Sequence, residues 1–278
     1  MKHLPFILFV SGLALGLASC QKQSDNTPET RALAADDSMV DFADRAIEGP
    51  ADALTMRSSQ FGPCGQGSSP FLPACVTITD SGEGVYPRTL TLDFGDGCTG
   101  PGGWTRSGVI DIVVTGDLRE DVGASRTITF TDYTAGPVTM FGTRTLTFLG
   151  DNAEGQPSYA QHHDFNIQRN GHTVHRLYDG TLAWLEGFDT DDCDDNVVQR
   201  DGLATHSANN AWGTTTRTIE AVVHDRPCGY PVSGTITVDR PMHDVVIDFG
   251  DGTCDNLATV TRNGNTVIID LDTHDVVG

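Results

Sequence analysis

The chain has 278 residues, of which 38% are hydrophobic and 20% are charged, and its formal net charge is −21. Such a length and hydrophobic content provide for one large domain, or two small ones, with a substantial core. The strong negative charge makes nucleic acid and anionic lipid headgroups poor partners, because like charges repel at close range. We therefore expect no nucleic-acid partner.

The first twenty residues have the pattern of an export signal. Met1-Lys2-His3 is followed by an apolar run from Leu4 to Leu17, shorter than the roughly 20 residues that a membrane-spanning helix needs. The run ends in Leu17-Ala18-Ser19-Cys20, which resembles a bacterial lipobox. We predict a signal peptide over residues 1–19 and an acylated Cys20; the alternative is an ordinary cleaved signal with an incidental cysteine.

The expected location is the outer membrane of the cell envelope. Gln21, after the lipobox cysteine, is not the aspartate that retains lipoproteins in the inner membrane of some bacteria. The membrane partner is then the lipid anchor on Cys20, and the domain faces either the periplasm or the outside. The polar residues that follow predict a disordered tether over 20–35.

Residues 36–60 predict a short helix and a linker. Asp36-Asp37-Ser38 is typical of a helix start, and Gly49-Pro50 stops or kinks the helix. Between them, apolar side chains recur at helical spacing: Met39, Val40, Phe42, Ala43, Ala46 and Ile47. We expect this apolar stripe to dock on a sheet rather than on a partner protein.

Residues 61–278 predict a β domain. From Val76 onward the hydrophobic period is two, and four runs alternate apolar with other residues: Leu90, Leu92 and Phe94; Ile110, Ile112 and Val114; Ile219, Ala221 and Val223; Val245, Ile247 and Phe249. Because no helical pattern separates these runs, an all-β fold is favoured, an antiparallel sandwich or a large curved sheet with an internal pseudo-repeat. The alternative is two consecutive β domains that divide between Leu149 and Ser158.

Two-residue hairpins are indicated at Asn170-Gly171 and Asn263-Gly264, because both central residues of a type I′ turn need positive φ. Asp179-Gly180 is a third candidate of the same type.

One phrase occurs twice, as Asp93-Phe94-Gly95-Asp96-Gly97-Cys98 and as Asp248-Phe249-Gly250-Asp251-Gly252-Thr253-Cys254. Each copy is followed by a Thr-Arg step, at Thr105-Arg106 and at Thr261-Arg262, which defines repeat units near residues 75–115 and 228–278. The phrase resembles the turn of PKD-type adhesion domains, whose flanking strands fit this chain poorly. We interpret it as scaffold: a strand that ends in a turn, with the aspartate capping backbone N–H groups.

Six cysteines remain besides Cys20, an even number that indicates disulfides in an exported chain. The repeat places Cys75 with Cys98 and Cys228 with Cys254, and elimination then pairs Cys64 with Cys193. A zinc site is not favoured for these cysteines, because the chain has no Cys-x-x-Cys pair.

Two groups of residues are candidates for a metal. Calcium takes six to eight oxygen ligands, and an acidic loop offers five carboxylates: Asp189, Asp191, Asp192, Asp194 and Asp195. A solvated loop that carries the third disulfide explains the same residues. His162-His163-Asp164, His172 and His175 flank the hairpin at Asn170-Gly171, where strand pairing would bring His163 or Asp164 opposite His175. A zinc site or a set of exposed histidines on a polar strand face both fit; no other cofactor is expected.

Several phrases are similar to a family of uncharacterised β-rich lipoproteins from Bacteroidota: Leu92 to Thr99, Gly142 to Thr145, Trp184 to Gly187 and Asp248 to Arg262. This resemblance implies a lipid-anchored, exported, β-rich chain, and it implies no activity or catalytic residue.

No nucleophile elbow, zincin motif or phosphate loop is present in the sequence. Our hypothesis is a non-catalytic binding or structural component of the cell envelope. The competing hypothesis is an exported hydrolase that acts on glycans or peptides through carboxylates or a metal.

Overall fold

The computed structural model describes residues 72–82, 85–100, 103–190, 195–209, 213–226, 228, 230–239, 244–271 and 276–277, together with seven residues of the N-terminal region. These seven are Met39, Val40, Ala43, Ile47, Ala51, Leu54 and Thr55, all in helical conformation. The β-strands are β1 (Thr77–Asp80), β2 (Arg88–Asp93), β3 (Cys98–Thr99), β4 (Thr105–Val114), β5 (Ser125–Ala135), β6 (Val138–Asp151), β7 (Pro157–Arg169), β8 (His172–Glu186), β9 (Val197–Ala208), β10 (Thr214–Asp225), β11 (Pro231–Asp239), β12 (Val245–Asp251), β13 (Leu257–Arg262) and β14 (Asn265–Asp270).

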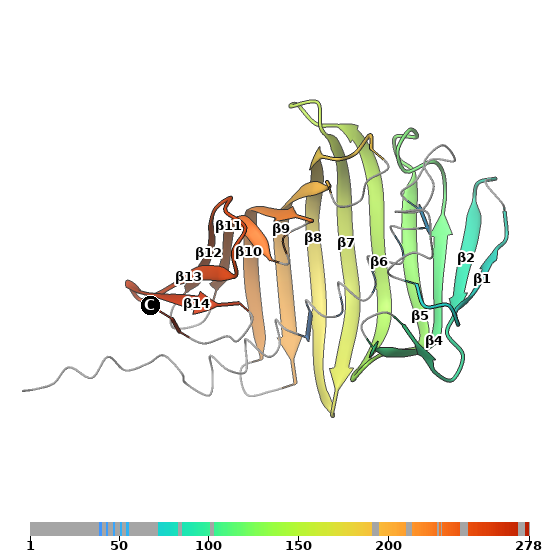
Figure 1. The fold of residues 1–278 in the computed structure, drawn as a ribbon, viewed down its shortest axis with the longest axis horizontal. Coiled ribbons are helices and arrows are strands. Elements are labelled where there is room, and N and C mark those ends of the chain that lie inside the picture. Colours follow the sequence, from blue (N-terminus) through green and yellow to red (C-terminus); the bar gives the residue numbers. More distant parts are fainter. Residues whose placement is uncertain are drawn as a thin grey trace, which may run out of the picture.

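The fold is all-β, as predicted, and it is one large antiparallel sheet rather than a sandwich. Apart from β3, which pairs only with β4, each strand lies beside its neighbour in the chain, from β1 at one edge to β14 at the other. The sheet is open and curved, and its longest strands, β6 to β8, stand in the middle (Figure 1). The segment around Gly150 to Pro157 is the connection between the paired strands β6 and β7, so the sheet continues across it.

Apolar and polar side chains alternate along the strands, so the two faces of the sheet differ. One face, here called the inner face, carries the apolar side chains of β2 to β8, among them Leu92, Ile112 and Phe165. The helical residues Met39, Val40, Ala43, Ile47 and Ala51 are buried in the same hydrophobic core, so the described members of the predicted stripe dock on the sheet. Phe42 and Ala46 of that stripe lie outside the described residues. Arg126 Nη1 also donates a hydrogen bond to Thr55 Oγ1 over 2.9 Å, which ties the helical residues to β5. No helix in the part of the chain that the structure describes is long and apolar enough to cross a membrane.

A β-bulge changes the alternation that the sequence indicated for β10. Ala221 has a φ of 49° and lies where the register between β10 and its neighbours shifts. The bulge inserts one residue, so Val222 is buried in place of Val223, and Ala221 is exposed. The predicted run of Ile219, Ala221 and Val223 on one face is therefore wrong after Ile219.

Two of the three predicted hairpin turns are confirmed. Asn170-Gly171 and Asn263-Gly264 connect β7 to β8 and β13 to β14, and all four residues have positive φ. The prediction for Asp179-Gly180 is wrong, because both residues lie within β8. Gly180 is instead required by packing: an added Cβ would collide with the phenol of Tyr178, which lies across the glycine.

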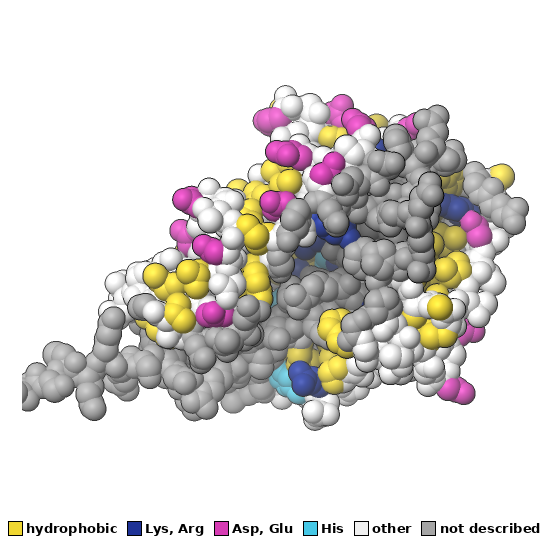
Figure 2. Space-filling model, viewed as in Figure 1, with side chains coloured by type: hydrophobic (Ala, Val, Ile, Leu, Met, Phe, Trp, Pro, Cys, Tyr) yellow, Lys and Arg dark blue, Asp and Glu magenta, His cyan; other side chains and the backbone are white. Residues whose placement is uncertain are grey.

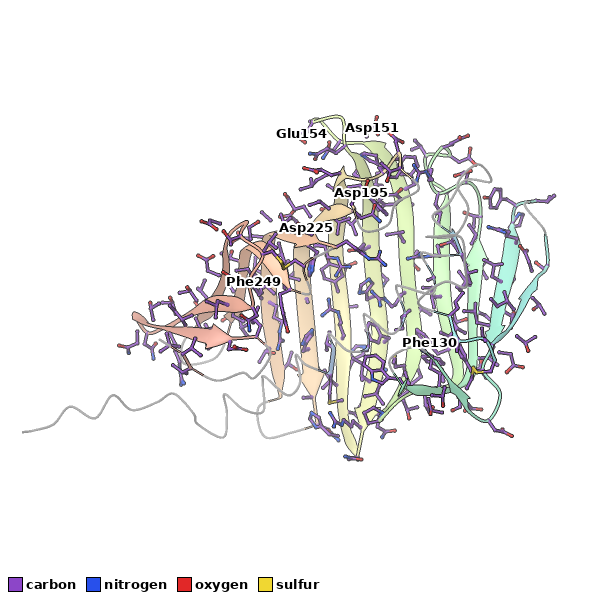
Figure 3. The ribbon with its side chains drawn as sticks, in the orientation of Figure 1. Phe130, Asp151, Glu154, Asp195, Asp225 and Phe249 are labelled. Atoms are coloured by element: carbon purple, nitrogen blue, oxygen red, sulfur yellow. A yellow bond between two sulfur atoms is a disulfide. The ribbon has the colours of Figure 1, made fainter. Side chains whose placement is uncertain are left out.

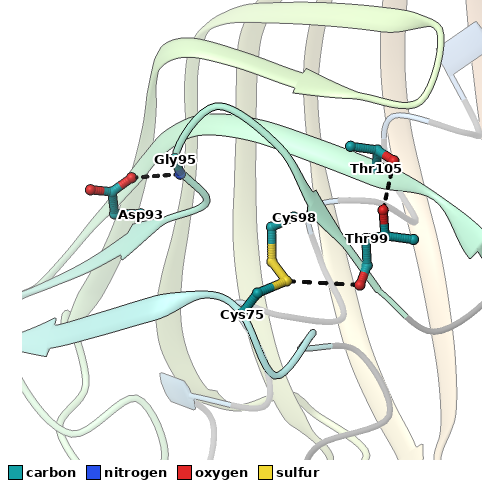
Figure 4. The surroundings of a disulfide bond; sticks show 6 residues. All are labelled: Cys75, Asp93, Gly95, Cys98, Thr99 and Thr105. Carbon is teal, nitrogen blue, oxygen red and sulfur yellow. Dashed lines mark hydrogen bonds between the residues drawn. A yellow bond between two sulfur atoms is a disulfide. The ribbon is translucent and has the colours of Figure 1, made fainter.

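The two copies of the repeated phrase share a turn and a disulfide. Asp93 Oδ1 accepts a hydrogen bond from the backbone N–H of Gly95, and Asp248 Oδ1 accepts one from Gly250 in the same way. The disulfides Cys75–Cys98 and Cys228–Cys254 are both formed, each with a Cα–Cα distance of 5.6 Å. Figure 4 shows the first of them. The scaffold interpretation is supported, and Cys20, Cys64 and Cys193 lie outside the described residues.

The Thr-Arg step does not occupy equivalent places in the two copies. In the first copy Asp93 pairs with Val109, and Arg106 lies opposite Cys98. In the second copy Asp248 pairs with Thr259, and Arg262 lies opposite Val245. The loop between the paired strands differs in length in the two copies, so the two Thr-Arg segments lie at different registers.

Removal of either described disulfide is expected to destabilise the protein. Each bond joins cysteines separated by 23 or 26 residues, and a loop of this size corresponds to about 3.5 kcal/mol of free energy of unfolding in the loop-entropy model. Urea denaturation of Cys75→Ala/Cys98→Ala and of Cys228→Ala/Cys254→Ala measures this loss. Peptide mapping without reduction is the control, and a Cys98 peptide joined to any partner but Cys75 would contradict the pairing.

Candidate functional site

The inner face carries buried arginine and histidine side chains. Two histidines and five arginines are buried, and no Asp or Glu is buried among the described residues. Five of these side chains form a continuous group on β6 to β10, here called the basic cluster: Arg144, His163, Arg176, His206 and Arg217. Since burial of a charged group costs free energy unless its surroundings compensate, this group demands an explanation.

Strand register brings the basic cluster together in two adjacent rows. In the first row Arg144 of β6 lies opposite His163 of β7, and His163 lies opposite Tyr178 of β8 on its other side. Arg217 of β10 belongs to the same row, two strands beyond Tyr178. In the second row Arg176 of β8 lies opposite His206 of β9. Because alternate residues of a strand share one face, the two rows lie side by side on the inner face.

Aromatic rings and hydrogen bonds hold the guanidinium groups in place. The guanidinium carbon of Arg144 lies 5.5 Å from the ring centre of Phe165, and that of Arg176 lies 5.1 Å from the ring centre of Tyr178. Such cation–π contacts stabilise an arginine without neutralising it. Arg217 Nη1 donates to Thr215 Oγ1 over 2.7 Å, and the Tyr178 hydroxyl donates to the carbonyl of Asp201 over 3.1 Å.

The arginines also determine which nitrogen of each buried histidine carries its proton. Arg144 Nη2 lies 3.2 Å from His163 Nε2, and Arg176 Nη1 lies 2.9 Å from His206 Nε2. A guanidinium only donates hydrogen bonds, so both Nε2 atoms must accept. Each imidazole is then neutral, with its proton on Nδ1.

Electrostatics keeps His163 neutral well into the acidic range. Burial lowers the pKa of His163 well below its ordinary value of 6.5, and the positive charges of Arg144, Arg176 and Arg200 lower the pKa further. His163 Nδ1 is buried and has no hydrogen-bond partner among the described residues. It is an N–H donor that faces the inner side of the sheet without an acceptor.

The acidic side chains that the structure describes are not buried with the basic cluster. Asp151, Glu154, Asp195 and Asp225 lie together along one end of the strands (Figure 3). The space-filling view shows Lys and Arg atoms recessed in the middle of the same face, with acidic atoms around the margin (Figure 2). Among the described residues of this protein of net charge −21, arginine side chains therefore gather at the centre of the sheet.

The histidines around the β7–β8 hairpin are divided between the two faces. His162 and His175 lie on the outer face, where His162 Nδ1 is 2.6 Å from Asp179 Oδ1 and His175 Nε2 is 2.8 Å from Asp164 Oδ1. Asp164 and His175 are in contact, as predicted, but Asn166 and not Asp164 lies directly opposite His175 in the register. His163 points to the opposite face and is only 4% exposed, so the interpretation of His163 as an exposed histidine is wrong.

No metal centre is assembled within the described part of the chain, where no three His, Cys, Asp or Glu side chains come close enough to hold an ion. Of the proposed calcium ligands, Asp191, Asp192 and Asp194 lie outside the described residues. Asp195 Oδ1 accepts a hydrogen bond from Thr190 Oγ1, and Asp189 lies 3.4 Å from Arg119 Nη2. The calcium site remains a prediction.

The basic cluster is the feature that sequence reasoning missed, although the sequence carries a signal for it. Four arginines stand between two hydroxyl residues, in Thr105-Arg106-Ser107, Ser125-Arg126-Thr127, Thr143-Arg144-Thr145 and Thr216-Arg217-Thr218. In a strand the hydroxyl residues share one face, so each arginine falls on the face of the apolar residues that follow it. Arg144, for example, is in phase with Leu146 and Phe148.

Comparison with protein-family models, with curated protein sequences and with solved structures finds no match for this chain. The chemistry of the cluster is therefore argued from its geometry. Guanidinium groups and neutral imidazoles with Nδ1–H offer hydrogen-bond donors. Because Nε2 of His163 and of His206 accepts from an arginine, neither imidazole is suited to removing a proton from a substrate.

The neutral state of His163 predicts a specific dependence of stability on pH. Below about pH 6.5 the unfolded chain takes up a proton at this histidine and the folded chain does not, so folding becomes less favourable as the pH falls. We expect wild type to lose about 1.4 kcal/mol of unfolding free energy, relative to His163→Gln, between about pH 7.5 and 5.5. Urea denaturation across this pH range measures the difference in unfolding free energy between wild type and His163→Gln. At the high-pH end this difference is the cost of the substitution itself. Parallel curves for the two proteins would show that His163 takes up its proton at the same pH in the folded and in the unfolded chain, which would contradict the lowered pKa.

Proposed function

We propose that this protein is a lipid-anchored, exported binding protein of the cell envelope, without catalytic activity, and that it holds its ligand against the inner face of its sheet. The observation that carries the proposal is the basic cluster. Its arginine and histidine side chains are buried and come from five adjacent strands, and Phe165 and Tyr178 position two of its guanidinium groups. Rigid strands position side chains more precisely than loops do, which suits a binding site.

The state of the buried histidines supports binding rather than catalysis. A general base needs a free lone pair and a pKa near the working pH. His163 uses the lone pair of Nε2 to accept from Arg144, and its pKa is well below 6.5. Because His206 Nε2 lies beside Arg176 in the same way, neither imidazole is available to accept a substrate proton.

The sequence supports the membrane attachment. The apolar run from Leu4 to Leu17 and the lipobox at Leu17 to Cys20 favour export and acylation at Cys20. Two or three acyl chains on one residue bind a membrane far more firmly than one chain does. The polar residues 20–35 would then hold the sheet away from the outer membrane, on its periplasmic or its external side.

The alternative function is an exported hydrolase that acts on glycans or peptides. The observation that favours it is the pair of His162 and Asp179 on the outer face, since a carboxylate that orients an imidazole is common to many hydrolases. Both side chains are at least half exposed, which leaves them in contact with water. Hydrolysis of a glycan or peptide that wild type performs and Asp179→Asn does not would favour this alternative.

Acylation at Cys20 is directly testable. Labelled palmitate is expected to enter the wild-type chain and to be absent from Cys20→Ala, and only the wild type should fractionate with membranes. Cys64→Ala is the matched control, because it removes a different cysteine and keeps the lipobox; it should retain the label. Equal labelling of wild type and Cys20→Ala, or no labelling of either, would overturn the membrane assignment.

A further inference from the structure

The two ends of the sheet differ in charge, and this difference indicates which end faces a membrane. We propose that the protein stands on an anionic membrane with the turns β5–β6, β7–β8 and β9–β10 towards the lipid and the opposite end of the sheet away from it. This inference rests on the lipid anchor at Cys20 proposed above. The partner surface is a bilayer that contains negatively charged headgroups.

Antiparallel pairing places successive connections at opposite ends of the sheet. The connections β5–β6, β7–β8 and β9–β10 lie at one end, here called the hairpin end, and β4–β5, β6–β7 and β8–β9 lie at the other, here called the acidic end. The strand β8 has 15 residues, which corresponds to a length of about 50 Å. A surface that touches one end of the upright sheet is therefore about 50 Å from the other end.

The connections in the middle of the sheet carry their acidic residues at one end only. Residues 136–137, 170–171 and 209–213, at the hairpin end, contain no Asp, Glu, Lys or Arg. At the acidic end one arginine, Arg119, accompanies six described acidic residues: Asp117, Glu120, Asp121, Glu154, Asp189 and Asp195. The connections nearer the edges add Asp255 and Arg226 to the acidic end, and Asp96 and Asp244 to the hairpin end, so the difference is concentrated in the middle.

The side chains at the two ends are placed to act on a surface. Glu120, Asp121, Glu154 and Asp189 are exposed, and the acidic end also carries the exposed Asp151 at the end of β6 (Figure 3). Asp189 lies 3.4 Å from Arg119 Nη2, an ion pair that offsets one of these charges. At the hairpin end the exposed Arg169 lies beside the turn Asn170-Gly171.

A negatively charged membrane distinguishes the two ends. Its surface potential acts over about one Debye length, which is ~10 Å at 0.1 M salt. With the acidic end down, the exposed carboxylates would lie within this distance and be repelled. With the hairpin end down, they would be about 50 Å away and fully screened, and Arg169 would be attracted. The second orientation therefore has the lower free energy.

The length of the chain before the sheet does not select an end. Residues 21–38 separate Cys20 from Met39, and these 18 residues span at most about 60 Å. This reach exceeds the length of β8, so an anchor at Cys20 permits either end to approach the lipid. The choice is then left to the charges of the two ends.

Energy transfer to labelled lipid tests the orientation. The acylated full chain is placed in vesicles of three parts phosphatidylcholine and one part phosphatidylglycerol, with an acceptor dye on a lipid headgroup. A donor dye is attached through an azide-bearing amino acid at Gln168, near the hairpin end, or at Ala153, at the acidic end; both residues are exposed. Transfer from position 168 is expected to be at least twofold more efficient than from position 153. Equal transfer, or more from position 153, would overturn the proposal.

Salt and matched charge variants test the electrostatic cause. About 1 M salt shortens the Debye length to ~3 Å and should remove the difference in transfer. The variant Glu120→Lys/Asp151→Lys/Glu154→Lys should abolish or reverse it at low salt. The control Glu220→Lys/Asp239→Lys/Asp244→Lys changes exposed residues and the net charge by the same amount, away from the acidic end, and should keep the wild-type order. A difference that high salt leaves unchanged, or one that both variants lose equally, contradicts the proposed cause.

Flotation of the same vesicles separates this inference from the anchor on which it rests. Wild type should float with the vesicles and Cys20→Ala should not. Absence of wild type from the floated fraction would refute the lipid anchor itself. Flotation together with equal transfer from the two positions would refute the orientation and leave the anchor in place.

Discussion

The constraint on which this structure depends is the cross-strand register of one uninterrupted antiparallel sheet. Each long strand pairs with its chain neighbours, so a row of residues across the sheet belongs to one face. Arg144 and His163 meet because β6 and β7 pair at that register, and Arg176 meets His206 through β8 and β9. A slip of one residue would move each of these side chains to the opposite face. The candidate site is thus a property of the backbone ladder and not of the loops.

The same register gives neighbouring residues different chemistry. His162 and His163 are adjacent in β7 and point to opposite faces. On the outer face His162 lies against the carboxylate of Asp179, and on the inner face His163 lies against the guanidinium of Arg144. Burial and the nearby guanidinium groups lower the pKa of His163 and keep it neutral. The residue type alone does not decide what a histidine does.

Net charge and local charge also lead to different expectations about partners. A net charge of −21 predicts repulsion of anions, and salt screens such long-range effects within about 10 Å at moderate ionic strength. Inside the sheet, contact distances and a low dielectric make the nearest charges dominate. Among the described residues the buried ionisable side chains are arginines and histidines, and no Asp or Glu is buried. The net charge of the chain therefore does not predict the charge of the groups nearest to a buried side chain.

The sequence by itself determined the features that depend on local chemistry. Apolar alternation predicted β2 and β4, Asn-Gly predicted two hairpins, and the repeated phrase predicted two disulfides, because each depends on residues that are close in the chain or on a repeated spacing. The tertiary structure decided the rest. Asp179-Gly180 reads as a turn but lies in a long strand, since Tyr178 needs the space above Gly180. The bulge at Ala221 moved Val222 into the core. Above all, the basic cluster draws on strands that span more than seventy residues of sequence, and only the pairing of those strands shows which arginines and histidines share a face.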